Sequence, residues 1–281
     1  MKLFTFIYMA LLLVCHISCQ DVVMDCEKPK VEIETRCIEE LRVQNLIQQA
    51  RNGDAEAYKI LALCYRDGNG VERSFLNMIF MHTIYCYKTA NDVRDFDELL
   101  EDGHVFKLMA ELMMEITDCN PFDNKSKTKI MQLKQIAPAE AKVLEAIDDF
   151  YCEKADLSTT IQKLQEAELA GSELSIILQL VYFEGTEDNT GLEGYLLRWA
   201  EKYPFLYLKI GELYVDRYYE SNKDLTCIRK SLDFYYKADA YGMLTPRCAN
   251  ALWCTYDKLG DKGLECDEQE KERLMRVAQC G

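Results

Sequence analysis

The sequence of 281 residues carries 48 acidic and 33 basic side chains, which gives a formal net charge of −15. Such a charge repels phosphate backbones and argues against a nucleic-acid partner. Hydrophobic residues make up 49% of the chain, which supplies enough apolar surface for a core and excludes a mainly disordered protein.

The first 19 residues have the three-part layout of a secretory signal peptide. Lys2 gives a positive start, residues 3–14 form a nearly unbroken apolar run, and the small residues Ser18 and Cys19 follow. The run is shorter than the roughly 20 apolar residues that a membrane helix needs. No second stretch of spanning length follows it. We therefore expect export without a transmembrane span, to the periplasm or outside the cell, with loss of the signal peptide.

A second processing route is open at the same place. Residues 17–19, Ile-Ser-Cys, resemble a bacterial lipobox, in which Cys19 would be lipidated and would anchor the chain to the outer membrane. His16 stands where a lipobox usually has leucine, which favours simple secretion. Residues 20–30, which include Pro29, are expected to be a linker to a single folded region at 31–281.

The clearest pair of predicted helices follows Gly53. Residues 55–65 form the first helix, residues 66–70 contain the turn glycines of a loop, and residues 74–90 form the second helix. Similar helix endings recur along the chain, and each is followed by glycine or asparagine, which accept left-handed backbone geometry. The endings at Gly53 and Asn91 are 38 residues apart. A period of this size indicates a stack of helical hairpins.

The remaining segments also have helical patterns. Residues 104–116 and 125–137 are predicted helices without loop glycines, and residues 267–280 form a highly charged helix that suits a C-terminal cap. Within the predicted helix near residue 210, apolar or small residues recur every three or four positions: Tyr207, Ile210, Gly211, Tyr214 and Tyr218. No long stretch alternates apolar and polar residues as a half-buried strand would.

The first hairpin resembles the Sel1-like repeat family, which is related to tetratricopeptide repeats. Its alanine-rich helix start, its Leu-x-x-x-Tyr segment at 61–65 and its Gly-x-Gly-Val loop at 68–71 match the family pattern. Partial copies follow at 180–185 and 210–214, and the resemblance covers about residues 45–281. The region 93–138 departs most from the pattern.

This resemblance implies an all-α fold, a right-handed α-α solenoid of stacked antiparallel helical hairpins. It also implies a scaffold or adaptor that binds a protein or peptide partner, without a cofactor or catalytic activity. The alternative that we keep open is a secreted hydrolase or cell-wall-active enzyme built on the same repeats.

The repeat pattern also has a physical explanation. Small residues such as Ala57, Ala62 and Gly211 let two helices approach closely, and tyrosines such as Tyr65 and Tyr214 fill the space between hairpins while their hydroxyl groups reach a polar rim. Each hairpin alone cannot bury its apolar stripe, so neighbouring hairpins must stack.

Thirteen cysteines make disulfides a further expectation, because an exported chain meets an oxidising environment. In an antiparallel hairpin, residues that face each other have position numbers with a nearly constant sum. The pairs that fit this rule or flank a loop are Cys37–Cys64, Cys248–Cys280, Cys119–Cys152 and Cys254–Cys266, of which the first two fit best. The alternative is that these cysteines are buried free thiols in a helical core.

Few residues suggest catalysis. Beyond the signal peptide only His82 and His104 are available as histidines, and His82 lies four residues before Cys86, as two metal ligands on one helix face could. The string Ser126-Lys127-Thr128-Lys129 has the Ser-x-x-Lys spacing of penicillin-interacting enzymes, but without their partner motifs it is better explained as a polar helix start. The tyrosines in excess of the repeat are candidates for an exposed groove: Tyr218, Tyr219 and Tyr241.

Overall fold

The computed structural model describes residues 40–93, 96, 99–101, 104–116, 122–186, 189–221 and 223–279. Within these residues it contains thirteen α-helices and one 3-10 turn but no strand, so the all-α prediction is confirmed. The helices are α2 (Glu40–Arg51), α3 (Ala55–Asp67), α4 (Phe75–Thr89), α5 (Val105–Ile116), α6 (Asn124–Ile136), α7 (Pro138–Tyr151), α8 (Leu157–Leu169), α9 (Glu173–Gly185), α10 (Asn189–Trp199), α11 (Leu206–Glu220), α12 (Leu225–Asp239), α13 (Pro246–Leu259) and α14 (Glu268–Ala278), with the 3-10 turn at Gly260–Lys262.

Local chemistry defines most helix starts. Eight helices begin after an Asp, Ser or Thr whose side chain accepts a hydrogen bond from a backbone N–H two or three residues later, which satisfies a donor that the helix cannot. These residues are Asp54, Ser74, Asp123, Asp156, Ser172, Asp224, Thr245 and Asp267.

Left-handed residues define several helix ends. Gly53, Gly171 and Gly242 have φ angles of 89°, 89° and 71°, as the repeated endings predict. The ending after α4 differs from the prediction, because Ala90 rather than Asn91 has the left-handed φ of 55°.

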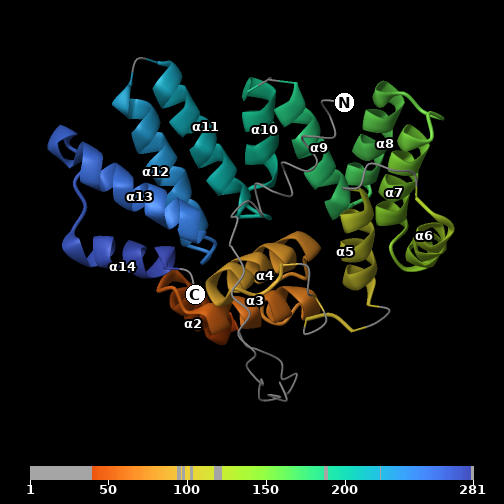
Figure 1. Ribbon diagram of the computed structural model, residues 1–281, viewed down its shortest axis with the longest axis horizontal. Coiled ribbons are helices and arrows are strands. Elements are labelled where there is room, and N and C mark those ends of the chain that lie inside the picture. The colour runs from red at the N-terminus through yellow and green to blue at the C-terminus, as the bar shows by residue number, and fades with distance from the viewer. Residues whose placement is uncertain are drawn as a thin grey trace.

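Neighbouring helices in the chain pack against each other, and Figure 1 shows those from α5 to α14 following one another around an arc. The α3–α4 hairpin lies across the open side of this arc (Figure 1). Because α4 contacts helices from the middle and the end of the chain, the first hairpin is part of the central core.

The N-terminal end of α4 is held by the middle of the chain. The backbone N–H of Leu76 donates to Glu173 Oε2 at 2.8 Å, and Asn77 Nδ2 donates to the carbonyl of Lys202 at 3.0 Å. One turn later, the ring of Phe80 stacks on Phe205 with a centroid distance of 4.9 Å. These contacts bury one end of α4 against α9 and the loop before α11.

The C-terminal end of α4 is held by the end of the chain. Lys88 is buried, and its ammonium donates to the carbonyls of Val277 at 3.0 Å and Gln279 at 2.9 Å. These carbonyls belong to the last turn of α14, where a helix lacks internal donors and favours a cation. The lysine therefore joins the first hairpin to the last helix.

A second joint between the two ends of the chain centres on Asp239. This carboxylate is fully buried and accepts hydrogen bonds from Arg51 Nη2 and Arg273 Nη2, each at 3.0 Å. Arg273 also donates to the carbonyl of Arg51 at 2.7 Å. One carboxylate thus connects α2, α12 and α14, and the described helices form a closed arrangement.

Two packing predictions are confirmed at α11. A methyl group on Gly211 would stand 2.8 Å from a ring carbon of Tyr235, so only glycine allows α11 and α12 to approach this closely. The hydroxyl of Tyr214 donates to Glu193 Oε1 at 2.7 Å, so this tyrosine fills the space beside α10 and reaches a polar group as expected.

Candidate functional site

The α11–α12 hairpin carries a row of stacked aromatic rings. Phe234 of α12 stands between two tyrosines of α11, with centroid distances of 6.1 Å to Tyr207 and 5.7 Å to Tyr214. The ring planes differ by only 25° and 13°, which is a stacked geometry. Tyr207 and Phe234 are half-buried, whereas Tyr214 is buried, so the row runs from the surface into the core.

Three cations lie over the rings of this row. Lys237 Nζ is 4.8 Å from the centroid of Phe234, and Lys230 Nζ is 5.2 Å from that of Tyr214. The guanidinium of Arg217 is 4.9 Å from the Tyr214 centroid. These distances are within the range of cation–π attraction. We call the six residues Tyr207, Arg217, Tyr214, Lys230, Phe234 and Lys237 the aromatic–cation face.

Two of the three cations have no acidic partner. Arg217 pairs with Glu193 at 2.6 Å, whereas neither Lys230 nor Lys237 forms a salt bridge with a described residue. Both lysines are exposed. In a chain with a net charge of −15, two unpaired ammonium groups over aromatic rings form a local site that favours negative charge.

The pKa shifts of Glu193 and Tyr214 agree with this arrangement. Although partial burial raises it, the pKa of Glu193 is lowered below its usual value by Tyr214, Arg217 and Lys230. Burial and the neighbouring Glu193 raise the pKa of Tyr214. Glu193 is therefore a carboxylate and Tyr214 a neutral hydroxyl at neutral pH. Glu193 forms its salt bridge with Arg217 and acts on Lys230 only through the electrostatic field.

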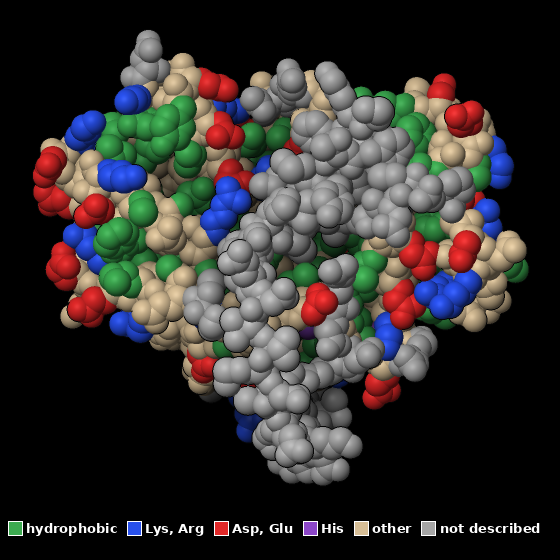
Figure 2. Space-filling model, viewed as in Figure 1, with side chains coloured by type: hydrophobic (Ala, Val, Ile, Leu, Met, Phe, Trp, Pro, Cys, Tyr) green, Lys and Arg blue, Asp and Glu red, His purple; other side chains and the backbone are tan. Residues whose placement is uncertain are grey.

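The spacing of these residues is regular. Tyr207 and Tyr214 are seven positions apart on α11, and Lys230 and Lys237 are seven apart on α12, with Phe234 between them. Seven residues make almost two helical turns and span about 10.5 Å. Figure 2 shows hydrophobic side chains bordered by lysine and arginine side chains in the region of α11 and α12, at the upper left.

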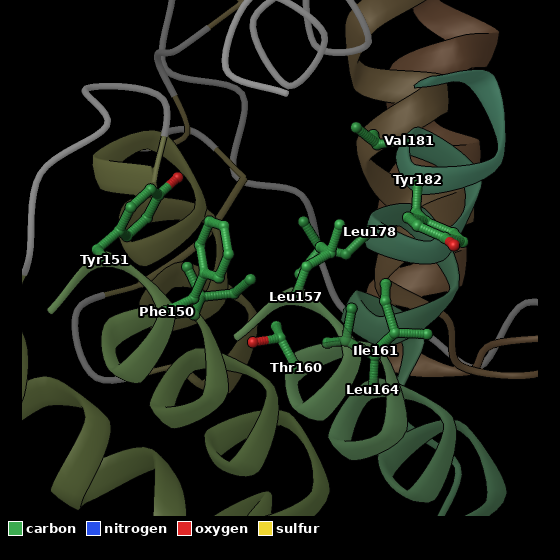
Figure 3. Close-up of a pocket in the computed structure, with 10 residues that line it drawn as sticks. Phe150, Tyr151, Leu157, Thr160, Ile161, Leu164, Leu178, Val181 and Tyr182 are labelled. Atoms are coloured by element: carbon green, nitrogen blue, oxygen red, sulfur yellow. The ribbon is translucent and has the colours of Figure 1, made fainter. Parts of the chain in front are cut away.

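A second surface feature is a small hollow between α7, α8 and α9 with a free volume of about 30 Å³ (Figure 3). Its lining is apolar and includes Phe150, Leu157 and Leu178. The single hydroxyl among the nonaromatic lining residues, that of Thr160, donates to the carbonyl of Asp156 at 2.9 Å. The hollow thus presents no charged or reactive group to a ligand.

The two histidines have local contacts. The Sγ atom of Cys86 is 3.4 Å from Nε2 of His82, and both side chains are buried in α4. His104 Nδ1 accepts from the backbone N–H of Phe106 at 3.2 Å, and burial and Arg73 lower the pKa of this histidine. Across the part of the chain that the structure describes, no three His, Cys, Asp or Glu side chains gather as metal ligands would.

The serine of the Ser-x-x-Lys string has a structural role. The buried hydroxyl of Ser126 donates to Asp123 at 2.8 Å and also contacts Glu115, at the start of α6. Lys129 pairs with Glu111 at 2.8 Å rather than with the serine. Partial burial lowers the pKa of Lys129, but the combined effect of Glu111 and Glu115 is larger and raises the pKa above its usual value. This lysine is therefore a poor base.

The cysteines that the structure describes are thiols. Burial raises the pKa of Cys64 to about 11 and that of Cys248 to about 12, which makes both thiols unreactive at neutral pH. Cys254 and Cys266, proposed to close the last loop, are separate thiols, and Cys152 is also a thiol. Cys64 was expected to form a disulfide with Cys37, Cys248 with Cys280, and Cys152 with Cys119.

Those three partner cysteines lie outside the described residues, as do Cys19, the signal peptide and the linker. The three disulfide pairs that involve these cysteines and the lipidation therefore stay predictions, whereas the structure shows no bond between Cys254 and Cys266.

The exposed tyrosines are only partly those expected from the sequence. Tyr219 and Tyr241 are 70% and 40% exposed, whereas Tyr218 is buried. Tyr214 belongs to the core as expected, and the aromatic–cation face was missed because nothing in the sequence showed that Tyr207 and Phe234 stack on it at half-buried positions. The signal that could have found it is the matching interval of seven between tyrosines on one helix and lysines on the next.

Comparison with known protein families, with curated proteins and with solved structures found no match to this chain. Among the described residues, no helix combines the length and apolar character needed to cross a membrane.

Proposed function

We propose that this chain is an exported, non-enzymatic helical-repeat scaffold that binds a protein partner through the aromatic–cation face. The observation that carries this proposal is the row of three stacked rings with two exposed, unpaired lysines over it. Aromatic residues are enriched in protein interfaces, where a few well-packed aromatic side chains carry much of the binding energy. The proposal keeps the right-handed solenoid of Sel1-like repeats as the architecture, with cleavage after residue 19.

The position of the first hairpin restricts where a partner can bind. In an open solenoid, the concave side usually offers the extended binding surface. Here α3–α4 lies across the open side of the arc and makes buried contacts with α9 and α14 (Figure 1). We therefore place the partner on α11–α12, where Phe234 is half-buried and Lys230 and Lys237 are exposed.

Site-specific photo-crosslinking in the native host tests this proposal. A photoreactive residue at position 230 or 237 should crosslink to one and the same protein, and a probe at the exposed Lys142 of α7 should not. The Phe234→Ala substitution should reduce the crosslink at position 230. Equal crosslinking from positions 142 and 230, or none from 230 and 237, contradicts the proposal.

The mature chain purified from the host gives the second part of the test. Mass spectrometry should find a chain that begins at Gln20 without a lipid. A retained leader would contradict export, and a diacylglycerol group on Cys19 would replace secretion by a lipoprotein.

A further inference from the structure

The partner's chemistry can be inferred from the same face, and this inference rests on the proposed function. We propose that the aromatic–cation face recognises an acidic amphipathic helix with two carboxylates seven residues apart. The apolar side chains between these carboxylates would cover the ring of Phe234.

Charge complementarity is the first argument. Lys230 and Lys237 are exposed, and neither forms a salt bridge with a described residue, although Lys230 is near enough to Glu193 and Asp224 to lower the pKa of each. A carboxylate that approaches either ammonium gains an ion pair without having to displace an acidic residue of the chain itself. The third cation, Arg217, is already neutralised by Glu193. The face therefore has two vacant positions for negative charge.

Geometry is the second argument. The two lysines are seven positions apart on a straight run of α12, which separates them by about 10.5 Å along the helix. A ligand helix that lies alongside α12 presents residues at the same interval on one face. Carboxylates at its first and eighth positions can thus meet both ammonium groups at once. Residues three and four positions after the first carboxylate then point at the rings, as in helix-in-groove recognition.

The rigid packing of the rings is the third argument. Gly211 lets α11 approach α12 so closely that Phe234 stacks between Tyr207 and Tyr214. The half-buried rings of Tyr207 and Phe234 are therefore held in place by the buried ring of Tyr214, which the hydrogen bond to Glu193 fixes. A preorganised surface of this kind loses little side-chain freedom when a ligand binds.

Titration of the mature protein with a labelled helical peptide of about 15 residues tests the inference. The peptide has glutamates seven positions apart and two leucines between them. We expect saturable binding that weakens as salt is added. The matched peptide with both glutamates replaced by glutamine should bind at least about tenfold more weakly, since it lacks the charges that the lysines attract.

Two variants of equal charge locate the binding. The double variant K230E/K237E should lose at least about tenfold in affinity for the acidic peptide, because it places like charges opposite the glutamates. The matched control K125E/K142E changes two exposed lysines of α6 and α7 and should bind as the wild type does. Circular dichroism of both variants should show an unchanged helical fold.

Three outcomes overturn the inference: equal affinity for the glutamate and glutamine peptides, equal affinity of the two double variants, or no peptide binding. The proposed function is judged separately by the crosslinks at positions 230 and 237. If these crosslinks persist while the acidic peptide fails, the face is an interface for a partner of another chemistry. If the crosslinks fail, the binding function itself is wrong.

Discussion

The α3–α4 and α11–α12 hairpins have similar construction but different surroundings. Each second helix begins after a side-chain cap, and each hairpin packs its two helices closely. The α4 helix has buried residues around most of its circumference and touches α9 and α14. By contrast, α12 has an outward side on which Lys230, Phe234 and Lys237 remain accessible.

The difference shows that the same hairpin motif can serve two purposes in one chain. Where other helices surround a hairpin, its aromatic residues add to the core, as Phe80 does against Phe205. Where one side stays open, stacked rings and lysines become a surface with its own charge. The surroundings rather than the hairpin itself therefore decide which residues can bind a partner.

The largest expected effect comes from removing one ring from each hairpin. Phe80 is only 8% exposed, so Phe80→Ala should lower the free energy of unfolding by about 3–5 kcal/mol. Phe234 is half-buried, and Phe234→Ala should cost about 1–2 kcal/mol while it weakens partner binding. Urea unfolding measures both values. Equal costs would mean that the two hairpins do not differ in burial.

The next prediction concerns Asp239, whose ion pairs join the first and last parts of the chain. Asp239→Ala should cost about 3–5 kcal/mol, because it removes the buried carboxylate that joins Arg51 and Arg273 and leaves Glu270 as the one acidic partner of Arg273 among the described residues. The double variant Asp239→Ala/Arg273→Met should recover part of this loss, since no buried charge is then left unpaired. A single variant as stable as the wild type would show that this joint does not contribute to closure.

A smaller effect is expected from the contact between α11 and α12. Gly211→Ala should cost about 1–3 kcal/mol, because the new methyl group overlaps the ring of Tyr235. Gly194 in α10 is the matched control, since a methyl group there meets no atom within 4 Å. Gly194→Ala should be neutral or stabilising by up to about 1 kcal/mol. Similar changes in melting temperature for both variants would contradict the close approach of the two helices.

The smallest effect is the pH dependence of the two caps. Burial raises the pKa of Glu173, which accepts a hydrogen bond from the backbone N–H of Leu76 in the first turn of α4. Its contribution to stability is therefore present below the unfolded value of about 4.3 and is lost as pH rises through the folded value. The hydrogen bond from the backbone of Thr226 lowers the pKa of Asp224, which caps α12. Its contribution is present above about 3.9 and is lost as pH falls through the folded value.

The matching substitutions should therefore respond to pH in opposite ways. Relative to the wild type, Glu173→Gln should be more stable at about pH 7 than at about pH 4, and Asp224→Asn should be less stable at about pH 7 than at lower pH. Unfolding curves across this range measure both trends. Slopes of the same sign would contradict the different surroundings of the two caps.

Local features of the fold could be predicted from the sequence. Predicted helices at 55–65 and 74–90 agree with α3 and α4 because the caps Asp54 and Ser74 and the left-handed Gly68 are properties of short segments. The closed arrangement could not be predicted, since Arg51 and Asp239 are 188 residues apart and nothing local indicates their pairing.

The candidate site could be predicted only in part. The pattern around Tyr207 and Tyr214 predicted a helix, but a tyrosine that packs between repeats and a tyrosine that stacks at the surface have the same spacing. Tyr214 packs against Glu193 of α10 and is buried, whereas Tyr207 is half-buried. This difference depends on how the neighbouring helices pack and cannot be read from the repeat pattern.

Hydrogen exchange of the mature protein, with and without the acidic peptide, tests most directly whether α11–α12 is the docking surface and α3–α4 the internal hairpin. We predict slower amide exchange on peptide binding in residues 206–220 and 225–239. Residues 55–67 and 75–89 should exchange slowly already in the free protein and should not change. Protection concentrated in α3–α4, or in α7–α9 around the apolar hollow, would contradict the account.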